Sequence, residues 1–162
     1  MPRASLLNVD IRHSRERCDV PFGDSSETPR ADIRAYWESL RGARAFPSTG
    51  DLDAKKVAYY WPNCLLMRRI PRSPLLEVER VFAAETRTAL GGGNPLANHG
   101  TAFVAALMLD IGQKARRRGT PVEELEHLPL PTGRRLFRAV ALPFSDDPPE
   151  IDHVLCHLEP AF

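Results

Sequence analysis

Residues 121–160 read PVEELEHLPLPTGRRLFRAVALPFSDDPPEIDHVLCHLEP, and this stretch decides the fold. It contains three runs of strand-forming residues, separated by the turn residues Pro-Thr-Gly at 131–133 and Ser-Asp-Asp-Pro-Pro at 145–149. Short connections of this composition join neighbouring antiparallel strands. The stretch therefore predicts a three-stranded antiparallel meander at the end of the domain.

The middle strand of this meander is apolar on both faces near its centre. One face carries the larger residues Leu136, Val140, Leu142 and Phe144 together with Arg138, and the other carries Phe137, Ala139 and Ala141. A strand with one solvated face alternates apolar and polar residues instead. We therefore expect one face to meet the core, and the other to be covered by an amphipathic helix at 29–41 or by a second copy of the chain.

The composition predicts one soluble domain. The chain has 162 residues, 43% hydrophobic and 27% charged, with a net charge of +1, so no overall field draws it to nucleic acid or membrane. Cys18, Cys64 and Cys156 are far apart and form no CxxC, which is typical of a reducing cytosol. The longest apolar run, 102–109, is too short for a bilayer, and the first residues lack the apolar core of a signal peptide. We expect a cytoplasmic protein without a membrane anchor.

The domain is expected to occupy residues 28–162. Residues 1–27 mix charges with Ser, Asp and Gly without a period, which predicts a disordered or loosely docked N-terminal arm. Thr28 and Pro29 then open a helix that Gly42 ends. The apolar residues of this helix recur at helical spacing: Ile33, Tyr36, Trp37 and Leu40.

The middle of the chain predicts a mixed set of elements. A second helix over 52–60 begins after Asp51, strands follow at 64–70 and 75–82, and helical turns follow at 83–90. The glycines at 91–93 indicate a loop, because no Gly-Lys-Ser/Thr follows them. The longest helix covers 101–118, and its basic last turn and Gly119 suit a helix end.

The last strand contains two histidines and a cysteine. His153 and His157 are four residues apart on one face, which on a strand separates them by roughly 13 Å, too far for one metal ion. We expect both histidines at the surface and Cys156 in the core. No metal site is assigned.

Three segments together resemble a family of small proteobacterial PAS-like proteins. They are Tyr36-Trp37-Glu38-Ser39-Leu40-Arg41-Gly42 with the following Phe46-Pro47-Ser48, the run from Leu136 to Ser145, and Ile151-Asp152-His153-Val154-Leu155. The resemblance covers about residues 31–160. Ala83-Ala84 stand where such families commonly show Gly-Thr, a departure in the middle of the chain.

The resemblance implies an α+β fold, a PAS-like five-stranded antiparallel sheet in order 2-1-5-4-3 with helices on one face and an N-terminal amphipathic helix. PAS domains are sensory and protein-interaction modules, usually dimeric and without catalysis of their own, and some bind haem, flavin or small metabolites. Asn94-Pro95-Leu96 does not match the Asn-Cys-Arg motif of the flavin photosensors. Haem-binding members use a histidine on or near the long helix, and His99 lies just before the helix expected at 101–118. The cofactor stays unassigned.

The leading hypothesis is therefore a stand-alone sensory or protein-interaction module that is not an enzyme. It would bind a small molecule, an unidentified protein partner such as a signalling protein, or both. The expected ligand pocket lies between the sheet and the helices at 83–90 and 101–118, with walls Phe82, Phe103, Leu107, Val140 and Leu142. The expected homodimer surface combines the first helix and the outer sheet face: Ile33, Tyr36, Trp37, Leu40, Phe137, Ala139 and Ala141.

Two alternatives remain open. A small enzyme would use an acid/base set among Asp110, Glu124, Glu126 and His127, although no spacing pairs them and no catalytic residue is assigned. A weak nucleic-acid-binding regulator would use the arginines at 116–118 and 134–135.

Overall fold

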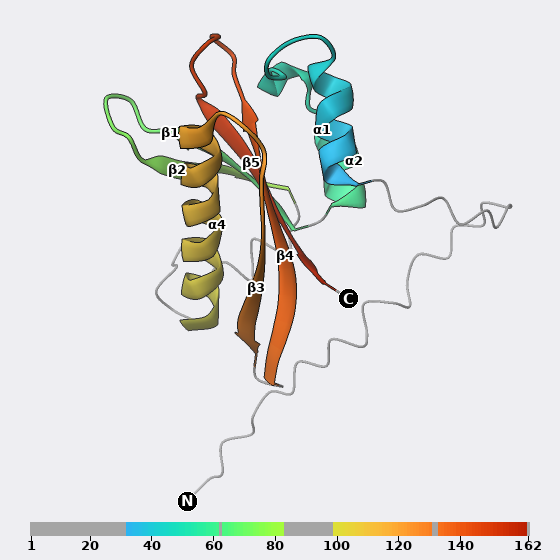
Figure 1. Ribbon diagram of the computed structural model, residues 1–162, viewed down its shortest axis with the longest axis vertical. Helices are drawn as coiled ribbons and strands as arrows, with labels where there is room; N and C mark the ends of the chain where they lie inside the picture. Colours follow the sequence, from blue (N-terminus) through green and yellow to red (C-terminus); the bar gives the residue numbers. More distant parts are fainter. Residues whose placement is uncertain (1–31, 62, 83–98, 131–132, 162) are drawn as a thin grey trace, which may run out of the picture.

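The computed structural model describes residues 32–61, 63–82, 99–130 and 133–161. Five antiparallel strands form one sheet in the order β2-β1-β5-β4-β3, which confirms the predicted α+β class and strand order (Figure 1). The strands are β1 Cys64–Arg69, β2 Leu76–Val81, β3 Val122–Leu130, β4 Gly133–Phe144 and β5 His153–Pro160. The last three strands are the predicted meander, and β4 pairs with both of its sequence neighbours.

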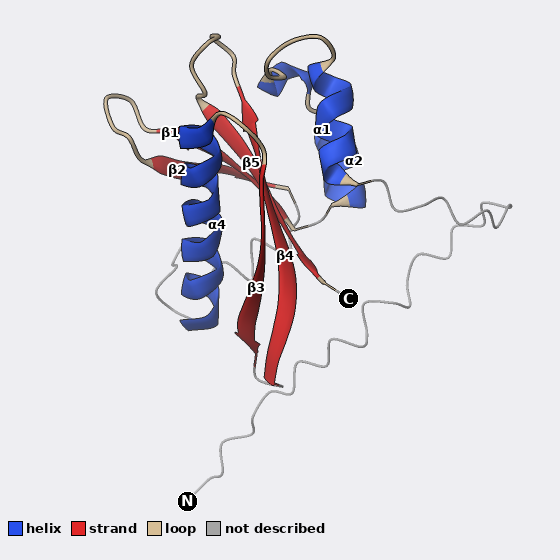
Figure 2. Ribbon diagram, viewed as in Figure 1, coloured by secondary structure: helices blue, strands red, loops and turns tan. Residues whose placement is uncertain are grey.

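The helical segments before the first strand begin at short capping side chains, and one long helix lies between the second and third strands. They are α1 Ile33–Arg41, the 3-10 turn η2 Thr49–Asp51, α2 Ala54–Tyr60 and α4 His99–Arg118 (Figure 2). Asp32 caps α1, and Gly42 ends it with a φ of 57°. Asp53 caps α2, so the expectation that Asp51 does so is wrong: Asp51 closes a capping box with Ser48 across η2.

Some expectations lie outside the described residues. These are the arm at 1–27, the helical turns at 83–90, and the loop containing Asn94. The expected start of the first helix at 29, with Thr28 as its cap, is wrong, because α1 begins at Ile33 after Asp32, whose backbone is extended. Within the described segments, no helix combines the length and apolarity needed to cross a membrane.

Helices cover both faces of the sheet. The family resemblance implied helices on one face, whereas the apolar second face of the middle strand predicted cover by the helix at 29–41 or by a second copy, and α1 provides this cover within the chain. The α4 helix packs on one side, and α1 and α2 pack on the other (Figure 1). Each side has its own apolar core. The α4 core contains Leu65, Met67, Leu76, Met108, Ile111, Ala115, Val122, Leu128, Ala139, Ala141, Val154, Cys156 and Leu158. The α1–α2 core contains Ile33, Tyr36, Trp37, Val57, Trp61, Cys64, Leu66, Val140, Leu142, Phe144 and Leu155.

The two faces of β4 are therefore exchanged relative to the expectation. Val140 and Leu142 face α1 and α2, and the small Ala139 and Ala141 face α4. On the α4 side the helix lies close to the sheet, since a Cβ added at Gly112 would lie 2.9 Å from Met67 Cε and 3.4 Å from Cys156 Sγ. Beneath this helix β4 contributes the small Ala139 and Ala141, and its larger Val140 and Leu142 fill the core of the other side.

The α1 helix is part of the folded domain. The buried Trp37 Nε1 donates a 2.8 Å hydrogen bond to the carbonyl of Pro143 at the end of β4. The Tyr36 ring stacks on Trp61, with ring centroids 4.9 Å apart, so α1 and the end of α2 pack against each other as well as against the sheet.

Candidate functional site

His153, the first residue of β5, lies where three segments of the chain meet. Its Nδ1 is 2.8 Å from Asp152 Oδ1 and 3.7 Å from Asp146 Oδ2 in the β4–β5 loop. Its Nε2 is 3.3 Å from Glu79 Oε2 on β2. We call His153, Asp146, Asp152 and Glu79 the His153 cluster.

Asp146 joins this cluster to the turn that follows α1. Its carboxylate accepts hydrogen bonds from Ser48 Oγ at 2.7 Å, from the Thr49 backbone N–H at 2.7 Å and from Thr49 Oγ1 at 2.6 Å. Partial burial opposes the ionised form, but the hydrogen bonds from Thr49 and Ser48 outweigh it and hold the pKa of Asp146 below its usual value. Asp146 therefore fastens the α1–α2 connection to the sheet.

The His153 cluster contains the donors of a possible metal site. Asp146, Asp152 and His153 each offer one ligand atom, and these atoms lie within 4.8 Å of one another. One imidazole and two carboxylates suit a divalent cation. However, both aspartates already accept hydrogen bonds, because Asp152 takes the Asp146 backbone N–H at 3.1 Å as well as His153. The hydrogen bonds account for the arrangement, and the cluster is a structural link between three segments.

A second polar chain lies on the α1–α2 face. Cys64 Sγ is 3.6 Å from His157 Nδ1, and His157 Nε2 is 3.4 Å from Glu159 Oε2. His157 is 3% exposed, so the expectation that both histidines lie at the surface is wrong for His157. Cys156 lies in the core of the opposite face, as predicted.

Cys64, His157 and Glu159 follow the order nucleophile, base, carboxylate. Cys64 is fully buried, and its burial, together with the charges of Cys156 and Glu159, raises the pKa of its thiol well above the usual value. A thiol is nucleophilic as a thiolate, and reactive cysteines are partly exposed. The set formed by Cys64, His157 and Glu159 is therefore a hydrogen-bonded part of the core.

Arg138 connects four elements on the same face. It binds Glu123 on β3 through two hydrogen bonds of 2.8 and 2.9 Å, Glu159 on β5 at 3.0 Å, and Asp32 at the start of α1 at 3.2 Å. The bond to Glu123 is the largest cause of the raised pKa of Arg138, and it lowers the pKa of Glu123. This cluster fixes the N-terminus of α1 over β4.

The five predicted pocket residues do not surround one cavity. Phe103 and Leu107 lie on α4, whereas Val140 and Leu142 lie on the opposite face of the sheet, and Phe82 packs with that opposite core. The assignment was wrong because it placed the large side chains of β4 toward the long helix.

A different set of apolar residues is incompletely covered on the α4 side. These residues are partly buried against the α4 core: Val81, Val104, Leu107, Leu109, Phe137 and Ile151.

The predicted dimer surface is mostly interior. Ile33, Tyr36 and Trp37 are at most 8% exposed and pack on the sheet of their own chain, with Leu40 partly buried beside them. Phe137, Ala139 and Ala141 face α4. The spacing of the first helix correctly predicted an apolar face. The sheet of the same chain covers this face, so it is not a dimer surface.

The candidate acid/base residues of the enzyme alternative do not all meet in one site. Asp110 and Glu124 both bind Lys114, at 2.8 and 3.0 Å. Glu126 and His127 are neighbours on β3, so their side chains leave opposite faces of the sheet.

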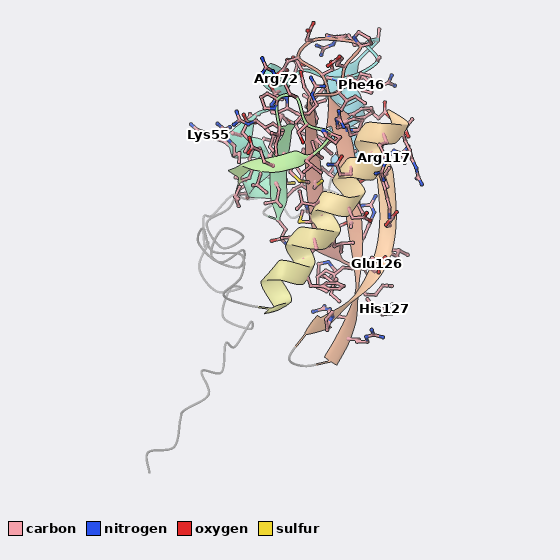
Figure 3. All side chains as sticks on the ribbon, turned by 90° about the vertical axis from the view of Figure 1, so that its left-hand side faces the viewer. Phe46, Lys55, Arg72, Arg117, Glu126 and His127 are labelled. Carbon is pink, nitrogen blue, oxygen red and sulfur yellow. The ribbon has the colours of Figure 1, made fainter. Side chains whose placement is uncertain are left out.

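The two arginine groups do not form one basic face. Arg116 donates to the carbonyl of Pro74 at 3.1 Å, so it holds the β1–β2 turn. The end of α4, near Arg117, and the β3–β4 hairpin, near His127, lie at opposite ends of the structure (Figures 1 and 3).

Neither a family model nor any curated protein matches this chain.

Proposed function

We propose that this chain is a PAS-like sensory module that binds a small, mainly apolar molecule and transmits its occupancy to a protein partner. The strand order β2-β1-β5-β4-β3, with the long helix α4 between β2 and β3, supports the PAS-like assignment. Two of the three resembling segments are also neighbours in the fold, because 136–145 covers most of β4 and 151–155 covers the start of β5, the strand that pairs with β4.

The ligand would lie beneath the N-terminal half of α4. The C-terminal half leaves no space, since Met108, Ile111 and Ala115 are buried and Gly112 almost touches the sheet. Toward the N-terminus, Val104 and Leu107 are only partly buried. This change in packing along one helix supports a ligand site at its N-terminal half.

The observation that carries this proposal is the incomplete burial of apolar side chains on α4 and on the sheet face that it covers. Val81 and Phe137 on the sheet, like Val104 and Leu107 on the helix, contact the α4 core but keep part of their surface uncovered. Phe103, which lies one helical turn before Leu107, is 47% exposed. Apolar walls with few polar groups favour a small apolar ligand.

The module has no catalytic step in this proposal, so its output is a change in partner binding. Self-association remains a prediction, but the residues first assigned to the dimer surface pack in the two cores of their own chain.

Native mass spectrometry of the purified protein tests the proposal. The wild type should carry a non-covalent mass that is lost on denaturation, and Leu107→Trp should remove it by filling the space. Tyr59→Trp is the matched control, because Tyr59 is 80% exposed on α2. Retention of the same mass by a folded Leu107→Trp protein would place the ligand elsewhere.

A further inference from the structure

One carboxylate lies beside the incompletely covered apolar residues on the α4 side. Val122 and Leu128 of β3 are buried in the α4 core, and Glu126 shares their face because alternate residues of a strand point the same way. Glu126 is half-buried and is the cross-strand partner of Phe137 (Figure 3 labels Glu126). Residues paired directly across two strands lie about 5 Å apart at Cβ, so Glu126 stands next to the partly covered Phe137.

The position of Glu126 along β3 brings it level with the middle of α4. Glu124 binds Lys114 in the C-terminal half of α4 at 3.0 Å, and β3 runs back along the helix from there (Figure 1). Two residues of a strand span about 7 Å, which corresponds to roughly four or five residues of a helix. Glu126 is therefore displaced from Glu124 toward the half of α4 that contains the partly buried Leu107 and Val104.

Glu126 differs from every other described glutamate, because no described cation neutralises it. Each of the others lies within salt-bridge distance of a basic side chain. These pairs are Glu38–Arg41, Glu77–Arg68, Glu79–His153, Glu123–Arg138, Glu124–Lys114, Glu150–Arg69 and Glu159–Arg138.

Lys114 and Arg135 lie on the same side of the sheet as Glu126 but form no ion pair with it in the described structure. Lys114 is held between Asp110 and Glu124, at 2.8 and 3.0 Å. Arg135, the diagonal neighbour of Glu126 toward the end of the hairpin, is exposed. A half-buried carboxylate beside apolar surface is stabilised most by a group that supplies a positive charge.

We propose that the site between α4 and the sheet selects amphipathic amines, with the protonated amino group on Glu126 and the apolar body against Phe137 and the N-terminal half of α4. This inference rests on the proposed function, because it names the ligand class of the same site. A neutral apolar molecule leaves Glu126 without a counter-charge, and an apolar acid brings two carboxylates together. Glu126 therefore sets the preference among molecules that have the same apolar body.

Three probes of equal length test this selectivity: 1-octylamine, 1-octanol and octanoate, each titrated into the purified protein at neutral pH. Shifts of the Val104 and Leu107 methyl groups give the dissociation constants. Octylamine should bind about fivefold more tightly than octanol, the upper range for a partly exposed ion pair, and octanoate should bind most weakly.

Variants of Glu126 assign the preference to its charge. Glu126→Gln should remove the advantage of octylamine over octanol, and Glu126→Lys should make octanoate bind more tightly than octylamine. Glu38→Gln is the matched control, because it removes the same charge from α1 on the opposite face of the sheet and should keep the wild-type order. Circular dichroism and the urea midpoint verify that each variant is folded.

The results separate this inference from the proposed function. Equal affinities for octylamine and octanol in the wild type, or a preference for octylamine that Glu126→Gln retains, would overturn the selectivity and leave the apolar site in place. An absence of shifts at Val104 and Leu107 with all three probes would overturn the proposed function and this inference together.

Discussion

Replacing Trp37 measures how strongly α1 is held to the sheet of its own chain. Its side chain is 3% exposed within the α1–α2 core, and its Nε1 donates to the Pro143 carbonyl at 2.8 Å. Trp37→Ala removes the apolar burial and the hydrogen bond together. Truncating a buried tryptophan costs about 3–5 kcal/mol, a large share of a total stability of about 5–15 kcal/mol.

Trp37→Phe separates the two contributions. Phenylalanine keeps most of the buried apolar area but leaves the Pro143 carbonyl without its donor, which should cost about 1–3 kcal/mol. The exposed Glu38, next along α1, supplies the control Glu38→Ala, whose expected effect is within about 0.5 kcal/mol.

Urea unfolding followed by circular dichroism provides the measurement for this series. The midpoint should fall in the order wild type, Trp37→Phe, Trp37→Ala, at an unchanged denaturant slope. A stability of Trp37→Ala within about 1 kcal/mol of the wild type would show that α1 does not pack on the sheet. It would refute the conclusion that α1 covers the second face of the sheet within its own chain.

Three further predictions follow from the packing and the charges. Gly112→Val should destabilise the protein by about 1–3 kcal/mol, because it forces α4 away from the sheet; a neutral effect in urea unfolding would contradict the close approach. Asp146→Ala should cost about 1–2 kcal/mol and increase hydrogen exchange at the Thr49 amide, whose partner it removes; unchanged exchange would contradict the fastening role. Because the folded-state pKa of Glu123 is lowered by Arg138, the stability contributed by Glu123 is present above its unfolded pKa and is lost as the pH falls through the folded value. Stability measured from pH 7 down to 3 should therefore decline less steeply in Glu123→Gln than in the wild type, and an equal decline would show that the pair contributes nothing.

The local elements were predictable because their signals are local. Turn residues defined the meander, and the spacing of Ile33, Tyr36 and Trp37 defined α1 and its apolar face. The strand order came from the family resemblance, since no local rule determines which strands become neighbours.

The assignment of faces was not predictable from alternation alone. A period of two separates Ala139 from Val140 but does not say which of them meets the long helix. Gly112 in the middle of that helix was the available signal, because a helical glycine costs stability unless a close contact requires it.

The polar clusters depend on contacts between distant segments. His157 is buried because Cys64 on β1 and Glu159 on β5 satisfy its ring, and Asp146 reaches Ser48 and Thr49 across almost a hundred residues. Asp152 next to His153 was the one local hint of a histidine–carboxylate pair.

The most direct test of the proposed function is methyl NMR of the protein titrated with the apolar probe 1-anilinonaphthalene-8-sulfonate. The account predicts shifts for the methyl groups of Val81, Val104 and Leu107 beneath α4, with little change for Val57 and Leu142 in the α1–α2 core. Shifts centred on Val57 and Leu142, or saturation of the probe without shifts on the α4 side, would contradict a ligand site between α4 and the sheet.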